Sequence, residues 1–451
     1  AAPVVGMRTT CWKSLRAQRI SSRWPWVTPS SMSQRYSATA AIRSPTHTEP
    51  RSASSLFLEG PLAERVLLLS VCIAYFLRRS ALPLGIDGYT YFIICASLIG
   101  ALGLYAVLAG GYRVNGACML MVALTAPSAF LAPEDSLSLP RWAGWVAVLA
   151  GVGPLFRGGT PCRIRRSLFK AGLLFSHACV VVSLAMLVTG LSLGGRGGFS
   201  GITGHSIFLS QLGAFATVDA FRRAGFSRHG NAWLLYSAAA GLLTLVAGSR
   251  AAIAGALCGL TLISYRRPRR WQFVLFVCLL GLSVVMLLLL GGSSDEELER
   301  GEQVHPWLSR IYMKGFTNSR TNLWLARWRE FVENPLFGVG FQCTTVGSGQ
   351  ARSAGAPVEP GSSFLAVLSM TGLAGAIGVM ILTADVLASA RRNWRRVDPR
   401  TQELMVAFVG AFVFILLAEG SIFAVGEACC ILFWSLAGIF GDLPESAKRL
   451  D

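Results

Sequence analysis

The sequence predicts an all-α polytopic membrane protein with about a dozen transmembrane helices and a helical extracytoplasmic loop. Hydrophobic residues make up 53% of the 451 residues and charged residues only 14%, whereas soluble domains carry about 25% charged residues. The apolar residues gather in long runs such as 271–290 and 362–384, and basic residues cluster between the runs. Because backbone groups in lipid must bond within their own segment, each run is predicted to be a helix.

Apolar runs long enough to cross a bilayer recur along most of the chain. About 20 apolar residues in a helix span the hydrocarbon layer, and Arg residues flanking a shorter run can extend to water. The last two runs could instead form one bent hairpin around Glu419 and Gly420. We predict spans at 62–77, 89–110, 114–132, 140–156, 171–190, 205–221, 231–248, 251–264, 271–290, 362–389, 402–419 and 422–440.

These runs divide the chain into five parts. Residues 1–60 are rich in Ser, Arg and Pro and are predicted to be a disordered, basic cytoplasmic leader, although a transit peptide has a similar composition. The first nine helices are expected in 61–290, the extracytoplasmic loop in 291–361 and the last three helices in 362–441. Residues 442–451 are predicted to form a cytoplasmic tail.

The net charge of +18 would fit a nucleic-acid-binding protein, but the distribution of basic residues argues against that class. With both termini inside, the basic residues fall in six successive segments predicted to be cytoplasmic, as the positive-inside rule expects. Arg78 and Arg79 are the main exception. The Cys and His spacings are not typical of a metal site. We expect no metal, no cofactor and no nucleic-acid partner.

The same orientation places few basic residues on the outer face. Arg196 lies in the segment GGRGGFSG, and Arg250 lies in AGSRAA. An Arg in a glycine turn or at membrane depth is costly to keep unpaired, so each is expected to contact an anion. His205, at the start of the helix predicted after Arg196, could contact substrate or act as a base, although a single His there is more often structural.

The strongest local signal in the outer loop is the segment 318–335. Arg320, Trp324, Arg327 and Phe331 recur at helical spacing and line one stripe. Two guanidiniums with Trp between them could bind a diphosphate, because the planar fork of Arg suits phosphate oxygens. The alternative is an interfacial helix that Trp and Arg anchor at the lipid headgroups. A glycine turn, LFGVGFQ, follows the segment.

Four segments together resemble the O-antigen ligase and polymerase superfamily of envelope polysaccharide assembly. They are GGRGGFSGITGHS (194–206), AGSRAA (247–252), SRTNLWLARWREFVENPLFGVG (319–340) and SSFLAVLSMTGLAGAIG (362–378). The resemblance implies a glycosyltransferase of the bacterial inner membrane that works on the outer face. It implies a donor glycan on undecaprenyl diphosphate and a polysaccharide or lipid-linked acceptor. Arg196 and Arg250 match family Arg residues that would neutralise the diphosphate.

One position departs from the ligase pattern. Ligases of the family carry a His eleven positions before the first Gly of a G-x-x-G motif. In this sequence that motif begins at Gly372, and Gly361 occupies the His position. Glu359 stands two residues earlier and could serve as the general base in its place. The departure favours a polysaccharide or exopolysaccharide polymerase over a ligase.

The alternative class is a multi-pass solute or anion transporter. Transporters tend to show inverted repeats and ionisable residues at the midplane of the membrane. The sequence shows no convincing internal repeat, and few ionisable residues fall in the middle of a predicted span. The location of the essential charges distinguishes the two classes, since a carrier needs them at mid-membrane and an enzyme of this kind at the outer rim.

Overall fold

The structure, a computed structural model, describes residues 61–79, 88–132, 137–191, 199–267, 318–345 and 361–443. For residues 76–79, 88 and 318–321 it describes the backbone alone. The predicted leader, the predicted span at 271–290 and the chain from residue 444 lie outside the described residues. Arg196, Glu359 and much of the predicted outer loop also lie outside them.

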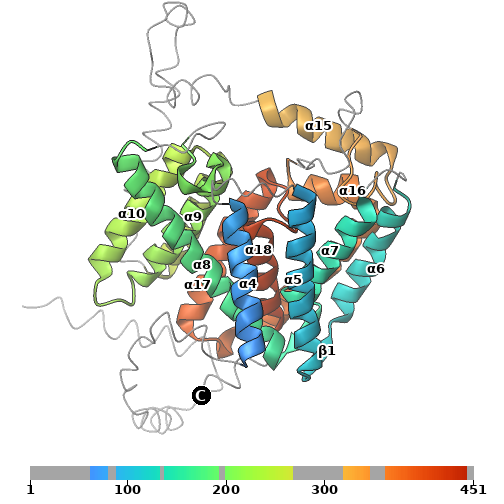
Figure 1. The fold of residues 1–451 in the computed structure, drawn as a ribbon, viewed down its shortest axis with the longest axis horizontal. Helices are drawn as coiled ribbons and strands as arrows, with labels where there is room; N and C mark the ends of the chain where they lie inside the picture. The colour runs from blue at the N-terminus through green and yellow to red at the C-terminus, as the bar shows by residue number, and fades with distance from the viewer. Residues whose placement is uncertain are drawn as a thin grey trace, which may run out of the picture. The chain divides into compact units, whose positions relative to one another are not determined.

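The described part of the chain is mostly helical, in agreement with the predicted fold class (Figure 1). The helices are α4 (Leu62–Arg79), α5 (Gly88–Leu108), α6 (Gly116–Phe130), α7 (Ser138–Gly151), α8 (Gly159–Val188), α9 (Ser206–Arg223), α10 (Gly230–Ala247), α11 (Arg250–Arg266), α15 (Asn318–Glu333), α16 (Ser363–Asn393), α17 (Pro399–Ala418) and α18 (Ala428–Gly441), with short 3-10 turns η1 (Gly201–Thr203) and η3 (Trp394–Arg396).

Among the described residues, five helices are long and apolar enough to cross a membrane, judged by length and composition: α5, α8, α10, α16 and α17. Each span predicted within the described residues overlaps a helix of the structure. The predicted total of about a dozen spans stays a prediction, because one of the expected spans lies outside the described residues.

Helix α8 begins twelve residues before the predicted span at 171–190, at Gly159. Its first turns carry Arg163, Arg165, Arg166 and Lys170, which lie between the predicted spans 140–156 and 171–190. Arg165 is 0% exposed, and it pairs with Asp442 while donating to the backbone oxygens of Val152 and Phe156. Asp442 lies 277 residues away along the chain, so a hydropathy pattern cannot show this pairing.

Two short strands precede α6 and α8. They are β1 (Tyr112–Val114) and β2 (Phe156–Gly158), which pair antiparallel with Arg113 opposite Arg157. The pairing places the start of α6 beside the start of α8. Strands of three residues are too short for an alternating pattern to predict them.

Helices α11 and α17 pack side by side in opposite directions. Gly255 lets α11 approach the backbone of Ala411 closely, as small residues do between membrane helices. Beyond the end of α11, Arg267 donates to both carboxylate oxygens of Glu403, at 2.7 and 2.5 Å. The start of α11, at Arg250, therefore lies beside the end of α17.

Ion pairs join the helix ends on one side of this bundle, which we call the basic end. It contains the starts of α4, α6, α8, α10 and α17 and the ends of α9, α11, α16 and α18. The pairs are Glu64–Arg163, Arg157–Asp385, Arg165–Asp442, Asp219–Arg222, Asp219–Arg223 and Arg267–Glu403. The opposite ends of the same helices are called the far end below.

The core beneath the far end is aromatic. Trp145 of α7 is fully buried. Its ring centroid lies 5.3 Å from those of Phe341 and Phe423 and 5.9 Å from that of Trp434. Phe341 belongs to the segment that follows α15, and Phe423 lies between α17 and α18. The chain after α15 is thus packed into the helix bundle.

Candidate functional site

The glycine turn after α15 docks into a break in α16. Helix α16 contains one residue with non-helical angles, Gly372, whose φ is 63°. The break leaves backbone groups without helical partners, and the turn supplies them. Val339 N donates to Ser369 O at 2.9 Å, and Leu373 N donates to Pro335 O at 2.8 Å. The segment 335–339 and the middle of α16 form one hydrogen-bonded unit.

Two glycines make this docking possible. A Cβ placed on Gly372 would lie 2.4 Å from the carbonyl carbon of Leu336, and one on Gly338 would lie 2.4 Å from that of Met370. Both glycines have a positive φ, which residues with a side chain rarely adopt. The segments 319–340 and 362–378 thus need glycine at these two positions, because a side chain at either would prevent the close approach of the two backbones.

The residues after the turn reach into the bundle. Phe341 N donates to Ser128 O at 3.1 Å, and Ser138 Oγ donates to Phe341 O at 3.0 Å. Arg141 of α7 donates to Gln342 O at 2.7 Å, and the Gln342 amide donates to a carbonyl oxygen between α17 and α18. The segment 335–342 is therefore held on both sides by helices of the bundle.

A buried carboxylate fixes the chain beyond Gln342. Glu330 of α15 accepts from Arg327 at 2.7 Å, from Thr344 Oγ1 at 2.6 Å and from the backbone N of Thr345 at 2.7 Å. Arg327 and Glu330 are each 1% exposed. Burial acts to raise the pKa of Glu330, but the hydrogen bond from Thr344, the charge of Arg327 and the N–H of Thr345 outweigh it and lower this pKa.

Neutralising Glu330 is expected to loosen the segment 336–345. Its pKa in the folded protein lies below the ordinary value of 4.5, so its stabilisation is complete above that value and is lost as pH falls through the folded pKa. Glu330→Gln should lose about 1–3 kcal/mol of local stability at neutral pH. Hydrogen exchange of Thr345 and its neighbours measures this. Glu333→Gln, which changes an exposed carboxylate of the same helix, should leave exchange unchanged; equal exchange in the two variants would contradict the expectation.

Trp324 holds the start of α16. Its indole Nε1 donates to Gly361 O at 3.0 Å, and the φ of Gly361 is 71°. Two residues on, Ser363 Oγ donates to Glu419 O at 2.6 Å. Gly361, at which the resemblance would place the His of ligases, is thus a left-handed glycine in contact with α15. It lies at the far end, beside the connection between α17 and α18.

The turn between α10 and α11 presents Arg250. Gly248, with a φ of 82°, ends α10, and the Ser249 side chain caps α11 by accepting from Ala252 N at 3.4 Å. Ser249 N donates to Ser210 Oγ of α9 at 3.3 Å, which ties the turn to a third helix. The Arg250 side chain is exposed at the start of α11.

His205 lies at the same end of the molecule. It is the residue before α9, its side chain is exposed, and its carbonyl accepts from Leu209 N at 3.1 Å. The first turn of α9 leads to Ser210, which contacts the Arg250 turn. His205 and Arg250 therefore both lie at the far end.

The structure thus gathers most of the described candidate residues at the far end. The contacts above place His205, Trp324 and Arg250 there, together with the start of α16. The side chain of Arg320 lies outside the described residues, as do Arg196 and Glu359. Arg327 faces inward to Glu330, so α15 does not expose Arg327 and Trp324 on one open stripe.

Sequence reasoning missed the inner partners of this region, namely Glu330, Thr344, Thr345 and the docking of the glycine turn. The closely spaced glycines of the segment 336–342 do indicate a turn. The sequence does not show that this turn docks on α16, because the two segments are separate in the chain. In the described part of the chain, His, Cys, Asp and Glu side chains form no group of three that could hold a metal ion.

The apolar helices indicate an integral membrane protein. Residues 235–380 match the family model described as O-Antigen ligase, which supports an O-antigen ligase-related superfamily. The match covers less than half of the chain, and it includes the Arg250 turn, α15 and the break in α16. It points to membrane enzymes that ligate or polymerise glycans and does not favour a transporter. No curated protein matches the chain.

Proposed function

We propose that this protein is a metal-independent glycosyltransferase of the bacterial inner membrane. It moves a glycan from an undecaprenyl-diphosphate carrier to a sugar acceptor on the outer face, as a polymerase or ligase of O-antigen or exopolysaccharide. The observation that carries the proposal is the location of the Arg250 turn and the start of α16 at one end of the bundle, within the region that matches the O-antigen ligase family.

The basic end supports the proposed orientation. Its many Arg residues would face the cytoplasm under the positive-inside rule, with both termini on that side. The far end would then face outward, where an exposed Arg250 can meet a lipid-linked diphosphate. A glycosyltransferase of this kind needs its charges at that rim, whereas a carrier needs them at mid-membrane.

We assign the chemistry as follows. Glu359, as general base, removes the proton from an acceptor hydroxyl, whose oxygen attacks the anomeric carbon of the carrier-linked glycan. The bond from that carbon to the diphosphate oxygen breaks, and undecaprenyl diphosphate leaves with the electron pair. Arg250 stabilises the charge that grows on the diphosphate, because a fixed cation aimed at developing charge lowers the barrier.

Other residues would bind substrate. Arg196 and Arg320 are proposed to contact the diphosphate, and Trp324 and His205 to border the glycan. Arg327 is proposed to act in the same site, and its burial against Glu330 favours a role in holding the segment that carries the turn. In the sequence, Glu359 stands two residues before Gly361, whose carbonyl oxygen accepts a hydrogen bond from Trp324.

Deletion of the gene in its host tests the proposal without knowledge of the sugar. The deletion strain should accumulate undecaprenyl-diphosphate-linked glycan and lose the corresponding polymer or transferred glycan, both measured by mass spectrometry of lipid and envelope extracts. The wild-type gene should restore both. Glu359→Gln should restore transfer at a rate about a hundredfold lower. An unchanged lipid-linked pool and unchanged polymer in the deletion strain would contradict the proposal.

A further inference from the structure

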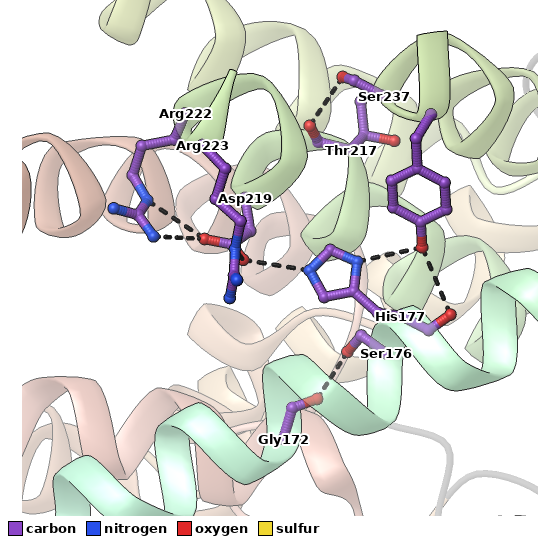
Figure 2. A network of polar contacts seen from close by, with 9 residues as sticks. Gly172, Ser176, His177, Thr217, Asp219, Arg222, Arg223 and Ser237 are labelled. Carbon is purple, nitrogen blue, oxygen red and sulfur yellow. Dashed lines mark hydrogen bonds and ion pairs between the residues drawn. The ribbon is translucent and has the colours of Figure 1, made fainter. Parts of the chain in front are cut away.

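A buried carboxylate at the basic end holds two guanidiniums and an imidazole (Figure 2). Asp219 of α9 is 0% exposed. Arg222 donates from Nε and Nη2 to its Oδ1 at 3.1 and 2.8 Å, and Arg223 donates from Nε to its Oδ2 at 2.6 Å. His177 of α8 lies 3.1 Å from Oδ2 through Nε2, and its Nδ1 lies 3.0 Å from the hydroxyl of Tyr236 in α10. The network joins α8, α9 and α10.

The charges in this network do not cancel. Asp219 carries one negative charge, and Arg222 and Arg223 carry one positive charge each. A carboxylate only accepts hydrogen bonds, so Nε2 of His177 must carry a proton, and even a neutral His177 leaves one positive charge in excess. Because Arg223 is the exposed member of the network, this surplus positive charge favours the approach of an anion there.

Arg223 and Trp233 form the exposed side of the network. The Arg223 side chain is 43% exposed and bonds Asp219 through Nε, so its two terminal nitrogens are not needed for that carboxylate. Its guanidinium carbon lies 5.3 Å from the centroid of the Trp233 ring, which in turn packs edge-on against His177 at 6.0 Å. The guanidinium is thus held from two directions.

The surroundings favour a lipid over a free ion. Leu174 of α8, one turn before His177, is 50% exposed, and Trp233, which packs against His177, is half-buried. An exposed leucine near a half-buried Trp is typical of the boundary between hydrocarbon and headgroups. A phosphate bound at Arg223 would have apolar surface next to it, which suits the rest of a phospholipid molecule.

Two further guanidiniums, from the end of α11 and the start of α17, lie over the turn that follows α9. Phe226, between α9 and α10, lies under two guanidinium groups, those of Arg267 at 3.9 Å and Arg400 at 4.8 Å from its centroid. Arg267 is paired with Glu403. Basic groups between membrane helices are a recurrent form of site for anionic headgroups.

We propose that Arg223 and Trp233 form a binding site for the phosphate of an anionic phospholipid at the basic end, in which Asp219 and His177 hold the two guanidiniums in position. The site is distinct from the glycan-transfer region at the far end and does not depend on the activity proposed there. The lipid would bridge α8 and the α9–α10 pair at the level of the headgroups.

Native mass spectrometry of the detergent-purified full chain tests the proposal. The protein is titrated with phosphatidylglycerol and, separately, with phosphatidylcholine of the same acyl chains. The wild type should retain phosphatidylglycerol in preference. Arg223→Gln should bind it about fivefold more weakly, since one basic residue near an anionic lipid contributes about that factor. Arg395→Gln, which removes the same charge from an exposed position of η3, should behave as wild type.

Further measurements separate the possible outcomes. Thermal unfolding in detergent shows whether Arg223→Gln keeps its fold, and Arg223→Lys, which keeps the charge, should recover part of the binding.

Adding inorganic phosphate at millimolar concentration should leave the lipid bound; displacement by phosphate would show a free-anion site instead. Equal binding of the two lipids by the wild type, or equal loss in Arg223→Gln and Arg395→Gln, would overturn the proposal whether or not Arg223→Gln folds.

Discussion

Arg250→Ala is expected to abolish glycan transfer while the protein stays folded in the membrane. The Arg250 side chain is exposed at the start of α11, and its backbone turn is fixed by the Ser249 cap and by Ser210. Truncation therefore removes the charge, while the contacts of Ser249 still hold the turn. Loss of one group that stabilises developing charge lowers a rate by about 10²–10³. The measurement is the rate of polymer formation in the deletion strain carrying the variant, at matched protein level.

The same helix supplies a matched control for this variant. Arg266 lies at the other end of α11, where it donates to Gln402 at 3.1 Å and packs over Trp394. Arg266→Ala removes the same charge at the basic end and should leave transfer near that of the wild type. Arg250→Lys should recover part of the activity, because it keeps the charge but loses the planar fork. Normal transfer by Arg250→Ala would exclude its role in the proposed mechanism.

Gly372→Ala is expected to cause the largest loss of stability. The new Cβ would lie 2.4 Å from the carbonyl carbon of Leu336, so either α16 or the docked turn must move. The backbone angles of Gly372, φ 63° and ψ −164°, lie in a region essentially restricted to glycine, which adds about 1–3 kcal/mol for a residue with a side chain, and overpacking adds about 1–3 kcal/mol. The variant should therefore lose roughly 2–6 kcal/mol, measured by thermal unfolding in detergent, together with protection of residues 336–345 from hydrogen exchange.

Gly110→Ala separates backbone strain from steric conflict. Gly110 also has a positive φ, of 74°, but a Cβ there would meet no atom within 4 Å. This control should show the cost of strain alone. If the two variants lose equal stability, the close contact between Gly372 and the turn does not contribute, and the docked arrangement would need revision.

Hydropathy predicted the bounds of several helices to within two residues. The predicted span 62–77 corresponds to α4 (Leu62–Arg79), and 231–248 corresponds to α10 (Gly230–Ala247). It failed at the start of α8, because Arg165 is buried by pairing with Asp442, which lies far away in the chain. The β1–β2 ribbon was missed because its strands are only three residues long.

The sequence indicated some residues of the candidate site but not the contacts between them. Arg250 and Trp324 could be singled out, because a charge in a glycine turn and an aromatic residue on a short helix are visible in sequence. Arg327 also repeats at helical spacing, but its partner Glu330 is three residues away on the inner face, and periodicity alone does not show which face is covered. The contact of Trp324 with Gly361 depends on the fold.

The break in α16 has a consequence for how the protein is made. Residues 335–339 leave the ribosome before α16, so in the proposed orientation the glycine turn would already have crossed the membrane when α16 enters it. The first part of α16 would then insert against a waiting partner, since its exposed backbone groups at Gly372 would be costly in bare lipid. In that orientation, the translocated chain before α16 would serve as the template on which α16 inserts.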